Sequence, residues 1–296
     1  MAQGRELKGR IKSIEGTRKI TRSMEMVATS KLKRAQDRVV AARPYAKALE
    51  AVIADLYSPE LAERFPLLRQ PEHGAQDDIP KSGSRAAVIL LTSNQGLAGA
   101  FNSNLIKEAR ALLARLTAGG VHAELHVVGR KGVGFFRYVG TPVATARVDI
   151  GDKPLAEHGP QLVDDLMKDF IEKKLDAVYV VYAKYNSPLS TPPVAERVLP
   201  VTPPVRTGPA RDYLLFPNAE QILTVLLPLT VRNAVYRALV ETVAGEQGAR
   251  RTAMKAATDN AGDILNDLRR TYNRARQAQI TQEIAEIVGG AEALSG

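Results

Sequence analysis

Two clusters of glycine residues stand where phosphate-binding chemistry could occur. Gly96-Leu-Ala-Gly99 follows an apolar run and precedes a helical pattern, which is where a dinucleotide-binding domain places its phosphate loop. The second cluster, Gly129-Arg-Lys-Gly132-Val-Gly134, has the glycine spacing of that fingerprint in reverse order. No Gly-x-x-x-x-Gly-Lys-Ser/Thr loop occurs in the sequence. Both clusters therefore favour tight turns between a strand and a helix, and we expect no nucleotide cofactor.

The histidine and carboxylate residues offer little for metal binding or acid–base catalysis. His122 and His126 are four residues apart on an expected strand, but no third ligand lies near them in the sequence. Asp164-Asp165 and the carboxylates of 259–263 fall on expected helices, where exposed carboxylates are ordinarily solvated. We expect no catalytic residue and no metal site.

Residues 84–217 alternate the sequence signals of strands and helices. Ser84–Thr92 and Leu175–Ala183 are near-continuous apolar runs, typical of strands that are buried on both faces of a sheet. Further strands are expected over 122–128 and 141–150, and helices over 102–116 and 159–174. Strands separated by single helices pair in parallel through right-handed crossovers. The segment is therefore predicted to be a small α/β domain.

Two segments beside this domain read as connections. Residues 58–83 contain several Pro, Gly and charged residues, which predicts an exposed linker. Residues 186–217 are rich in Pro, which favours an edge strand followed by a connector. The α/β domain is therefore placed at 84–217, with helical arms over 1–57 and 218–296.

Both arms are long and nearly free of helix breakers. The N-terminal arm, about residues 6–57, contains Pro44 and two Gly, and the C-terminal arm, about residues 230–288, contains no Pro. At about 1.5 Å per residue, such helices would reach about 80 to 90 Å. Because helices in proteins depend mainly on tertiary packing, each arm must be covered by a partner. We expect the two arms to pair with each other.

The apolar residues of both arms recur at alternating steps of three and four, the pattern of a left-handed coiled coil. The predicted seam residues are Leu32, Ala35, Val39, Ala42, Ala46, Leu49, Ile53 and Leu56, and in the C-terminal arm Ile280, Ile284, Ile287, Ala291 and Leu294. A plain amphipathic surface helix is the alternative, but the N-terminal pattern persists over more than three heptads. The sequence therefore predicts that the arms form a coiled coil.

The composition excludes several classes of protein. A chain of 296 residues with 45% hydrophobic content can hold one or two domains with a proper core. No run of 18 apolar residues and no apolar leader after Met1 are present, so we expect neither a membrane span nor secretion. The lack of Cys removes disulfides and thiolate metal sites. A cytoplasmic location fits best.

The positive charge is concentrated in the N-terminal arm. The chain has a formal charge of +9, and residues 1–57 supply +7 through 13 Lys/Arg against 6 Asp/Glu. A basic helix over residues 8–38 suits nucleic acid, an acidic protein surface or a solvated face. The arms lack Trp and have few Phe and Tyr that could stack on bases. Two alternatives stay open on charge and motifs alone: a coiled-coil protein that binds nucleic acid, and an α/β enzyme that binds a nucleotide near Gly96 or Gly129.

Four blocks of the sequence resemble the gamma subunit of F-type ATP synthase. They occur in the family's order, near both ends and in the middle, so the resemblance covers essentially the whole chain. The blocks are Lys19-Ile-Thr-Arg-Ser-Met-Glu-Met-Val-Ala-Thr-Ser-Lys31, Gly96-Leu-Ala-Gly-Ala-Phe-Asn102, Ala257-Thr-Asp-Asn-Ala261, and the segment from Tyr272 to Leu294. The last block, which contains Arg276-Gln-Ala-Gln-Ile-Thr281, is the most specific of the four.

The resemblance implies both a fold and a function. In that family the terminal helices form a long antiparallel coiled coil, and the middle of the chain is a Rossmann-like α/β domain without a nucleotide. The chain would be the central-stalk rotor, which transmits rotation of the membrane c ring to the catalytic sites of the alpha/beta hexamer and couples proton flow to ATP synthesis or hydrolysis. It would perform no bond chemistry itself.

The resemblance also implies partners and a location. The expected partners are the hexameric ring of alpha and beta subunits, the epsilon subunit and the c ring, with no nucleic acid. The chain would lie at the cytoplasmic face of a bacterial cell membrane as a peripheral protein, touching the membrane only through the c ring.

Particular residues carry over from the family by their positions in these blocks. Arg276, Gln277 and Thr281 would meet loops of the surrounding alpha and beta subunits, with fork-like hydrogen bonds from Arg276 to an acidic partner. The positions that the family associates with efficient coupling are Met24, Arg250 and Glu286.

Overall fold

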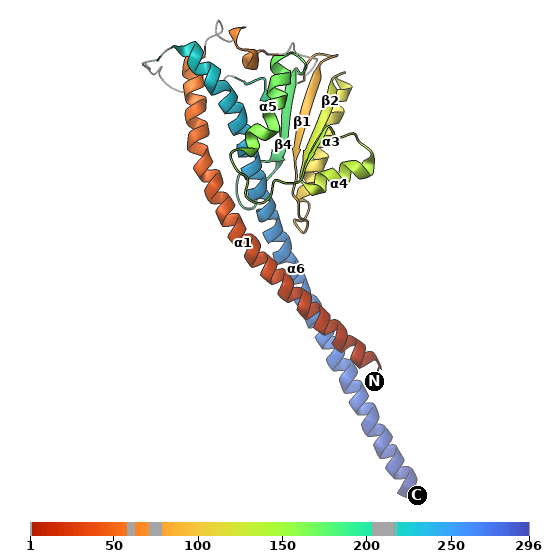
Figure 1. The fold of residues 1–296 in the computed structure, drawn as a ribbon. Coiled ribbons are helices and arrows are strands. Elements are labelled where there is room, and N and C mark those ends of the chain that lie inside the picture. Colours follow the sequence, from red (N-terminus) through yellow and green to blue (C-terminus); the bar gives the residue numbers. More distant parts are fainter. Residues whose placement is uncertain (1, 58–62, 71–78, 203–215, 217, 296) are drawn as a thin grey trace. The chain divides into compact units, whose positions relative to one another are not determined.

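The structure is a computed structural model, and it describes residues 2–57, 63–70, 79–202, 216 and 218–295. The two predicted helical arms are confirmed as α1 (Ala2–Leu56) and α6 (Ala219–Ser295) (Figure 1). The second begins earlier than its breaker-free stretch suggested, because Pro228 lies inside the helix.

The chain divides into two compact units. Unit 1 consists of Met1–Thr29 and Arg250–Gly296, and unit 2 consists of Ser30–Ala249. Both α1 and α6 contribute residues to both units, so each unit contains a part of each long helix.

Unit 2 is built on a five-stranded sheet with the strand order β3-β2-β1-β4-β5. The strands are β1 (Arg85–Leu91), β2 (His122–Val128), β3 (Thr145–Arg147), β4 (Ala177–Ala183) and β5 (Pro193–Leu199). The first four are parallel, and β5 pairs antiparallel with β4 at the edge of the sheet. This confirms the predicted parallel strands and the edge strand, although β3 is much shorter than the predicted 141–150.

Helices cover both faces of this sheet. On one face lie α3 (Phe101–Ala118) and α4 (Arg130–Val139), which share a buried cluster with β1 and β2 (Figure 1). On the other face lie α5 (His158–Ile171) and the early turns of α6. The connection from β3 through α5 to β4 therefore crosses to the face opposite that of α3, which gives the doubly covered arrangement of a Rossmann-like domain.

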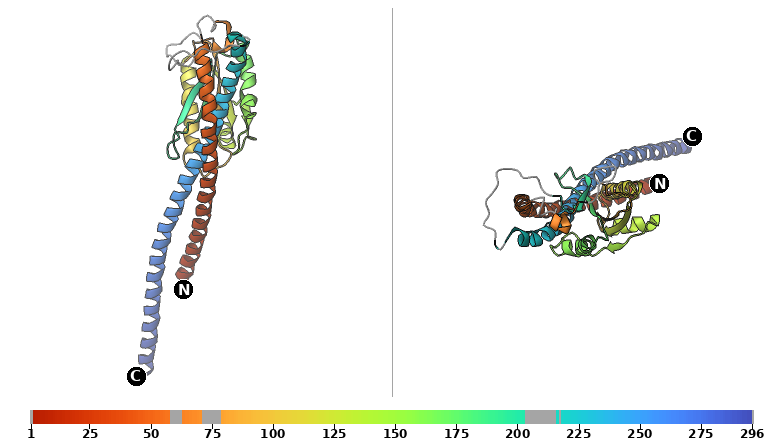
Figure 2. Two further views of the ribbon diagram at one scale, coloured as in Figure 1. Left: turned by 90° about the vertical axis from the view of Figure 1, so that its left-hand side faces the viewer. Right: turned by 90° about the horizontal axis from the view of Figure 1, so that it is seen from above.

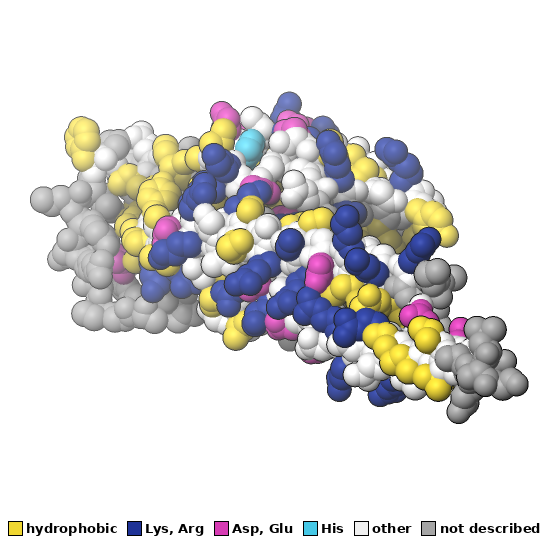
Figure 3. Space-filling model, turned by 90° about the horizontal axis from the view of Figure 1, so that it is seen from below, with side chains coloured by type: hydrophobic (Ala, Val, Ile, Leu, Met, Phe, Trp, Pro, Cys, Tyr) yellow, Lys and Arg dark blue, Asp and Glu magenta, His cyan; other side chains and the backbone are white. Residues whose placement is uncertain are grey.

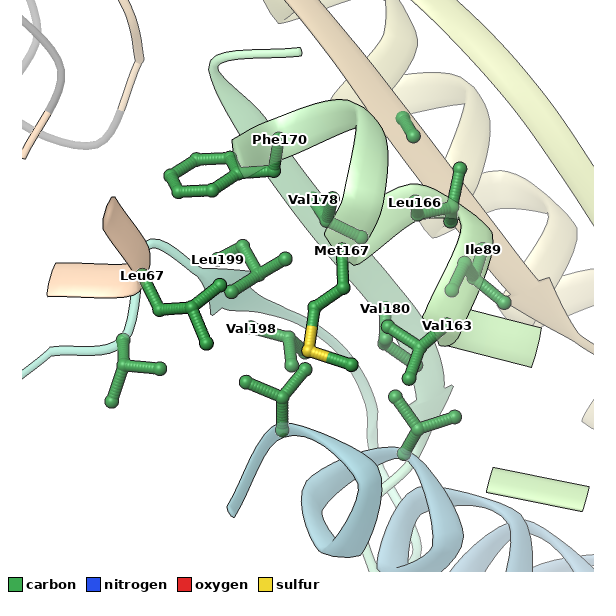
Figure 4. Close-up of a cluster of buried hydrophobic side chains, with 14 of the residues drawn as sticks. Leu67, Ile89, Val163, Leu166, Met167, Phe170, Val178, Val180, Val198 and Leu199 are labelled. Atoms are coloured by element: carbon green, nitrogen blue, oxygen red, sulfur yellow. The ribbon is translucent and has the colours of Figure 1, made fainter. Parts of the chain in front are cut away.

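The larger core fills the space between the sheet, α5 and α6. Figure 4 shows Met167 of α5 directed between Val180 of β4 and Val198 of β5, in the same cluster as Phe170 and Leu199. Each of these side chains is buried. At about 25 cal/mol per Å² of buried apolar area, side chains of this size dominate the stability of the unit.

The early turns of α6 belong to the same core. Leu223, Leu227 and Val231 are almost fully buried there. Among the described helices, α6 contains a window that is long and apolar enough to cross a membrane by length and composition alone. A helix that packs into a protein core can have the same composition, and 33% of that window is buried in the structure.

The N-terminal seam predicted for the coiled coil is confirmed within unit 2. Leu32, Ala35 and Val39 of α1 form a buried cluster with Val240 and Ala244 of α6. Farther along α1, the remaining seam residues are buried except Ala42, which is half-buried; they are Ala46, Leu49, Ile53 and Leu56.

Unit 1 is an antiparallel helix pair, as predicted. Thr258 of α6 donates a hydrogen bond from Oγ1 to Oγ1 of Thr21 of α1 at 2.8 Å. Farther along the pair, Arg269 of α6 forms an ion pair with Glu15 of α1. As residue numbers rise on one helix they fall on the other, so the two helices of the pair run in opposite directions. The two threonines form a buried polar layer, which in coiled coils favours one register over its neighbours.

The C-terminal part of the predicted seam is wrong for this chain alone. Ile280, Ile284 and Ile287 are 45%, 56% and 72% exposed. With Glu15 opposite Arg269, the start of α1 lies opposite about residue 282, so the end of α6 has no helix to pack on (Figure 2). The side chains of Ala291 and Leu294 lie outside the described residues.

Within the described part of the predicted exposed linker over 58–83, several apolar residues are buried and other residues are exposed. A short 3₁₀ helix, η1 (Pro66–Leu68), buries Leu67 and Leu68 in the larger core. Ile79 is buried against the opposite face of the sheet. Pro and charged residues gave the segment the composition of a loop, while its few apolar residues pack as core.

Removal of the Phe170 side chain tests the larger core. The ring is fully buried, and the Arg69 guanidinium lies 5.0 Å from its centroid. Phe170→Ala is expected to lower the free energy of unfolding of the full chain by about 3 to 5 kcal/mol, measured by chemical denaturation. Tyr138→Ala, at a side chain that is 91% exposed, is the matched control and should change it by less than about 0.5 kcal/mol. Equal effects of the two variants would contradict the described core.

Candidate functional site

The turn after β2 is packed directly against the end of β1. Gly129 has a φ of +100°, and a Cβ placed there would lie 2.2 Å from the backbone oxygen of Thr92. Gly132 has the same constraint, because a Cβ there would lie 2.8 Å from Thr92 Oγ1. Both glycines are therefore required by close packing between two turns, as the sequence predicted, and the spacing serves the fold.

The first N–H groups of α4 are all used within the chain. Arg130 N–H donates to Asn94 Oδ1 at 2.9 Å, and Lys131 N–H donates to the backbone oxygen of Ser93 at 3.1 Å. Gly132 N–H donates to Thr92 Oγ1 at 3.0 Å. In a dinucleotide-binding domain, free N–H groups at such helix starts hold phosphate oxygens. Here side chains and backbone of the β1 turn take that place, which argues against a nucleotide site near Gly129.

The turn that contains Gly96 is closed by its own polar side chains. Asn102 Oδ1 accepts a hydrogen bond from Ser93 N–H at 3.0 Å, and its amide nitrogen donates to Ser93 Oγ at 2.9 Å. Asn94 donates from Nδ2 to the backbone oxygens of Val148 and Ile150 at 3.1 and 2.9 Å. These contacts fix the turn against the neighbouring loop without a ligand.

His126 and Asp164, which the sequence raised as candidates for chemistry, bond to other side chains of the fold. His126 lies 3.0 Å through Nδ1 from Thr145 Oγ1, and burial lowers its pKa despite the opposing charge of Glu124. Asp164 accepts two hydrogen bonds from Arg232, at 2.7 and 2.9 Å. Within the described part of the chain, no group of three or more His, Cys, Asp or Glu could hold a metal ion.

Some basic residues of α1 within unit 2 contact other elements of that unit. Lys31 forms an ion pair with Asp152, and Arg38 donates to the backbone oxygen of the same residue at 3.2 Å. Arg43 donates to the backbone oxygen of Tyr185 at 3.1 Å. On the face shown in Figure 3, Lys and Arg side chains still predominate over Asp and Glu. Because several cations of this arm hold the fold together, the arm is less suited to a continuous phosphate-binding stripe.

All six residues predicted to contact partners fall in unit 1. Four of them lie within eleven consecutive residues of α6, and each of the four is exposed; they are Arg276, Gln277, Thr281 and Glu286. Thr281 Oγ1 donates to the backbone oxygen of Gln277, and Glu286 accepts a hydrogen bond from Gln282. None of these contacts engages another element, so the side chains are available to a partner.

The other two predicted residues lie elsewhere along the pair. Met24 of α1 is half-buried, one turn from the buried Thr21. Arg250 of α6 is only 6% exposed, so its side chain is buried, unlike the four exposed side chains at the end of α6. The structure therefore brings four predicted residues together at one end of α6 and leaves these two apart from them.

Comparison with known sequences identifies the family. A family model described as ATP synthase matches residues 3–294. An ATP synthase gamma chain from Gemmatimonas aurantiaca is 63% identical over the full length of both chains. This chain belongs to the ATP synthase gamma chain family. Gamma chains from Psychrobacter cryohalolentis and Frankia casuarinae are 38% and 40% identical, over 100% and 99% of this chain and 100% and 98% of theirs.

Solved structures share the fold of this gamma chain family member. A chain of the Euglena gracilis mitochondrial ATP synthase rotor has 17% identity and a TM-score of 0.63, over 94% of this chain and 99% of that one. A second Euglena gracilis structure, of the OSCP, F1 and c-ring assembly, has 19% identity and a TM-score of 0.66, over 99% of this chain and 95% of that one. At these identities the likeness concerns the fold alone.

Sequence reasoning missed the polar side chains that close the turns of this gamma chain. Asn94 holds three partners at the carboxyl edge of the sheet, yet it stood only in a short polar run after an apolar strand. Polar residues directly after a buried parallel strand are the signal that could have identified it, because this edge is where α/β domains place their sites. In this chain the polar residue after the strand, Asn94, bonds to the protein itself.

Loss of the Asn94 side chain tests this closure. Asn94→Ala removes three hydrogen bonds and leaves Arg130 N–H and two carbonyl groups without these partners. The free energy of unfolding of the full chain should fall by about 1 to 3 kcal/mol in chemical denaturation. Asn104→Ala, on the exposed side of α3, should leave it within about 0.5 kcal/mol. A wild-type value for Asn94→Ala would mean that water replaces the side chain at no cost.

Proposed function

We propose that this chain is the central-stalk rotor subunit of an F-type ATP synthase. It would transmit rotation of a membrane c ring to the catalytic sites of an alpha/beta hexamer, and so couple proton flow to ATP synthesis or hydrolysis. Full-length membership of the gamma chain family supports this role. The observation that carries it is the helix pair of unit 1, in which α6 extends past the start of α1 and leaves Ile280, Ile284 and Ile287 exposed.

Those isoleucines need a cover that this chain does not supply. They lie on α6 at steps of four and three, so they form one apolar stripe along the helix. Burial of such side chains is worth about 1.5 to 3 kcal/mol each. A ring of alpha and beta subunits around unit 1 would bury them without needing any fixed polar contact, which suits a shaft that must turn.

The exposed polar residues beside the stripe would make the contacts that change with rotation. We propose that Arg276, Gln277 and Thr281 meet loops of the alpha and beta subunits, and that Met24, Arg250 and Glu286 serve coupling. Exposed ion pairs are worth about 0 to 1 kcal/mol, so such contacts can form and break during a turn. Differential contact at each angle would bias the conformations of the catalytic subunits.

The chain itself would carry out no bond chemistry. The closed turns at Gly96 and Gly129 support this, because the first N–H groups of α4 donate to Asn94 and Thr92, and Ser93 and Asn102 bond each other in the Gly96 turn. Unit 2 would instead bind epsilon and rest on the c ring. The protein would then lie at the cytoplasmic face of a bacterial cell membrane, with no nucleic acid partner.

A charge introduced at Met24 tests the contact role of unit 1. Met24 is half-buried, and Met24→Lys places a cation at the proposed subunit contact. ATP-driven proton pumping by the assembled complex is expected to fall about threefold or more, while the chain still folds and assembles. Met26→Lys is the matched control, at a side chain two residues away that is 61% exposed, and it should retain most pumping. Unchanged pumping in Met24→Lys would exclude Met24 from the coupling surface.

Isolation of the native complex tests the function as a whole. The affinity-tagged chain would be recovered from gently solubilised membranes, with identification of the co-purifying chains and an ATPase assay. Stoichiometric alpha, beta and epsilon subunits with ATPase activity are expected. Recovery of nucleic acid, or of the chain alone, would contradict the proposal.

A further inference from the structure

A single arginine in unit 2 faces carboxylates on three different elements. Arg237 of α6 lies 3.8 Å from Glu50 of α1, 3.3 Å from Glu196 of β5 and 3.9 Å from Glu241 one turn along α6. Its side chain is 26% exposed. Both long helices and the edge of the sheet therefore meet at one guanidinium.

The carboxylates around Arg237 are themselves held in place. Tyr182 of β4 donates from its hydroxyl to Glu196 at 2.6 Å, and burial together with that bond raises the pKa of Tyr182. Glu241 accepts a hydrogen bond from Tyr185 N–H at 2.9 Å and is almost fully buried. Two of the three carboxylates are thus fixed by the sheet or by the loop that follows β4.

The packing on either side of this group is open. Clefts of about 460 and 480 Å³ lie between α1, α6 and β5, and Glu50, Glu196 and Arg237 line both of them. The charged group therefore forms a polar bridge between α1, α6 and β5 beside these clefts. It adds a charged contact to the apolar cluster that Ile53 of α1 shares with Val198 of β5.

In this bridge one guanidinium is shared among three carboxylates. No contact between Arg237 and a carboxylate is shorter than 3.3 Å, so there is no tight two-bond fork. Burial by itself would lower the pKa of Arg237, but Glu196, Glu241 and Glu50 raise it overall. Without the cation, three carboxylates would face one another around a half-buried space, and their repulsion would push α1 and β5 apart.

We propose that Arg237 is a positioning residue that makes α1, α6 and the sheet of unit 2 turn as one body. This inference rests on the proposed rotor function, because it concerns how torque applied to the α/β domain reaches both long helices. Apolar contacts hold surfaces together without fixing direction, so two packed surfaces can shift under load. A charge held between carboxylates on three elements resists such shifts in several directions at once.

The test compares coupling with and without an opposing proton gradient. Complexes that contain Arg237→Met, Arg237→Lys or wild-type chain would be assayed for ATP hydrolysis and for protons pumped per ATP as the opposing gradient increases. Arg237→Met should hydrolyse ATP within about twofold of wild type, yet pump about threefold fewer protons per ATP at the highest gradient. Arg237→Lys keeps the shared charge and should restore most of the ratio.

Controls separate this role from simple loss of stability. Arg85→Met removes an ion pair with Glu124 inside the sheet and should leave the ratio unchanged at every gradient. Glu50→Gln keeps Arg237 and alters only the α1 side of the bridge, at a side chain that is 51% exposed, so it tests the role even where Arg237→Met fails to assemble. It should show a smaller loss of the same kind.

One outcome would contradict the role of Arg237, and a different outcome would contradict the rotor function. A pumping ratio that does not depend on the gradient in either Arg237→Met or Glu50→Gln would overturn the role of Arg237. A wild-type chain that neither joins the complex nor supports pumping would overturn the rotor function itself.

Discussion

Helices in proteins gain most of their stability from tertiary packing, so the 77 residues of α6 depend mainly on what covers them. Its early turns are covered by α5, the sheet and η1 in the larger core. Its middle turns are covered by α1, first through Val240 and Ala244 and then through Thr258 and Leu265. Its last described turns have no cover within this chain. The helix thus passes through three environments, and the last one calls for other subunits.

The sheet of unit 2 has the mostly parallel strand arrangement found in nucleotide-binding domains. Parallel strands and glycine turns are present, but the first N–H groups of α4, after Gly129, donate to Thr92, Ser93 and Asn94. The same physical need, partners for unsatisfied N–H groups, is met by the protein instead of by a ligand. These hydrogen bonds tie the turns after β1 and β2 to each other, and such a connection suits a domain that must carry force.

Much of the architecture was predictable because it depends on periodicity that local sequence carries. The buried strands over 84–92 and 175–183 were visible as apolar runs, and the seam from Leu32 to Leu56 as steps of three and four. The exposure of Ile280 was not predictable, because periodicity reveals an apolar stripe but not which chain covers it. Burial of Leu67 and Leu68 was hidden by their Pro-rich surroundings.

The candidate site divides in the same way. Residues such as Arg276 and Gln277 were found through resemblance to a family, and nothing in their local pattern distinguishes them from other exposed helix residues. Arg237 and Asn94 were missed because their partners are distant in sequence, with Glu196 and Glu50 on other elements and Val148 and Ile150 in a later loop. Charge networks across elements leave no periodic trace.

The division into units has a consequence for the synthesis of the protein. Arg250 follows Thr29 by 221 positions, so the two halves of unit 1 leave the ribosome far apart in time. At about 5 to 20 residues per second, the first segment waits on the order of 10 to 40 s for its partner. During that interval Ala28 and Thr21, which are buried in the finished helix pair, have no partner helix to cover them. The sheet of unit 2 can assemble meanwhile, because all of its strands precede Arg250 in the chain, so unit 1 is the last part of the protein that can form.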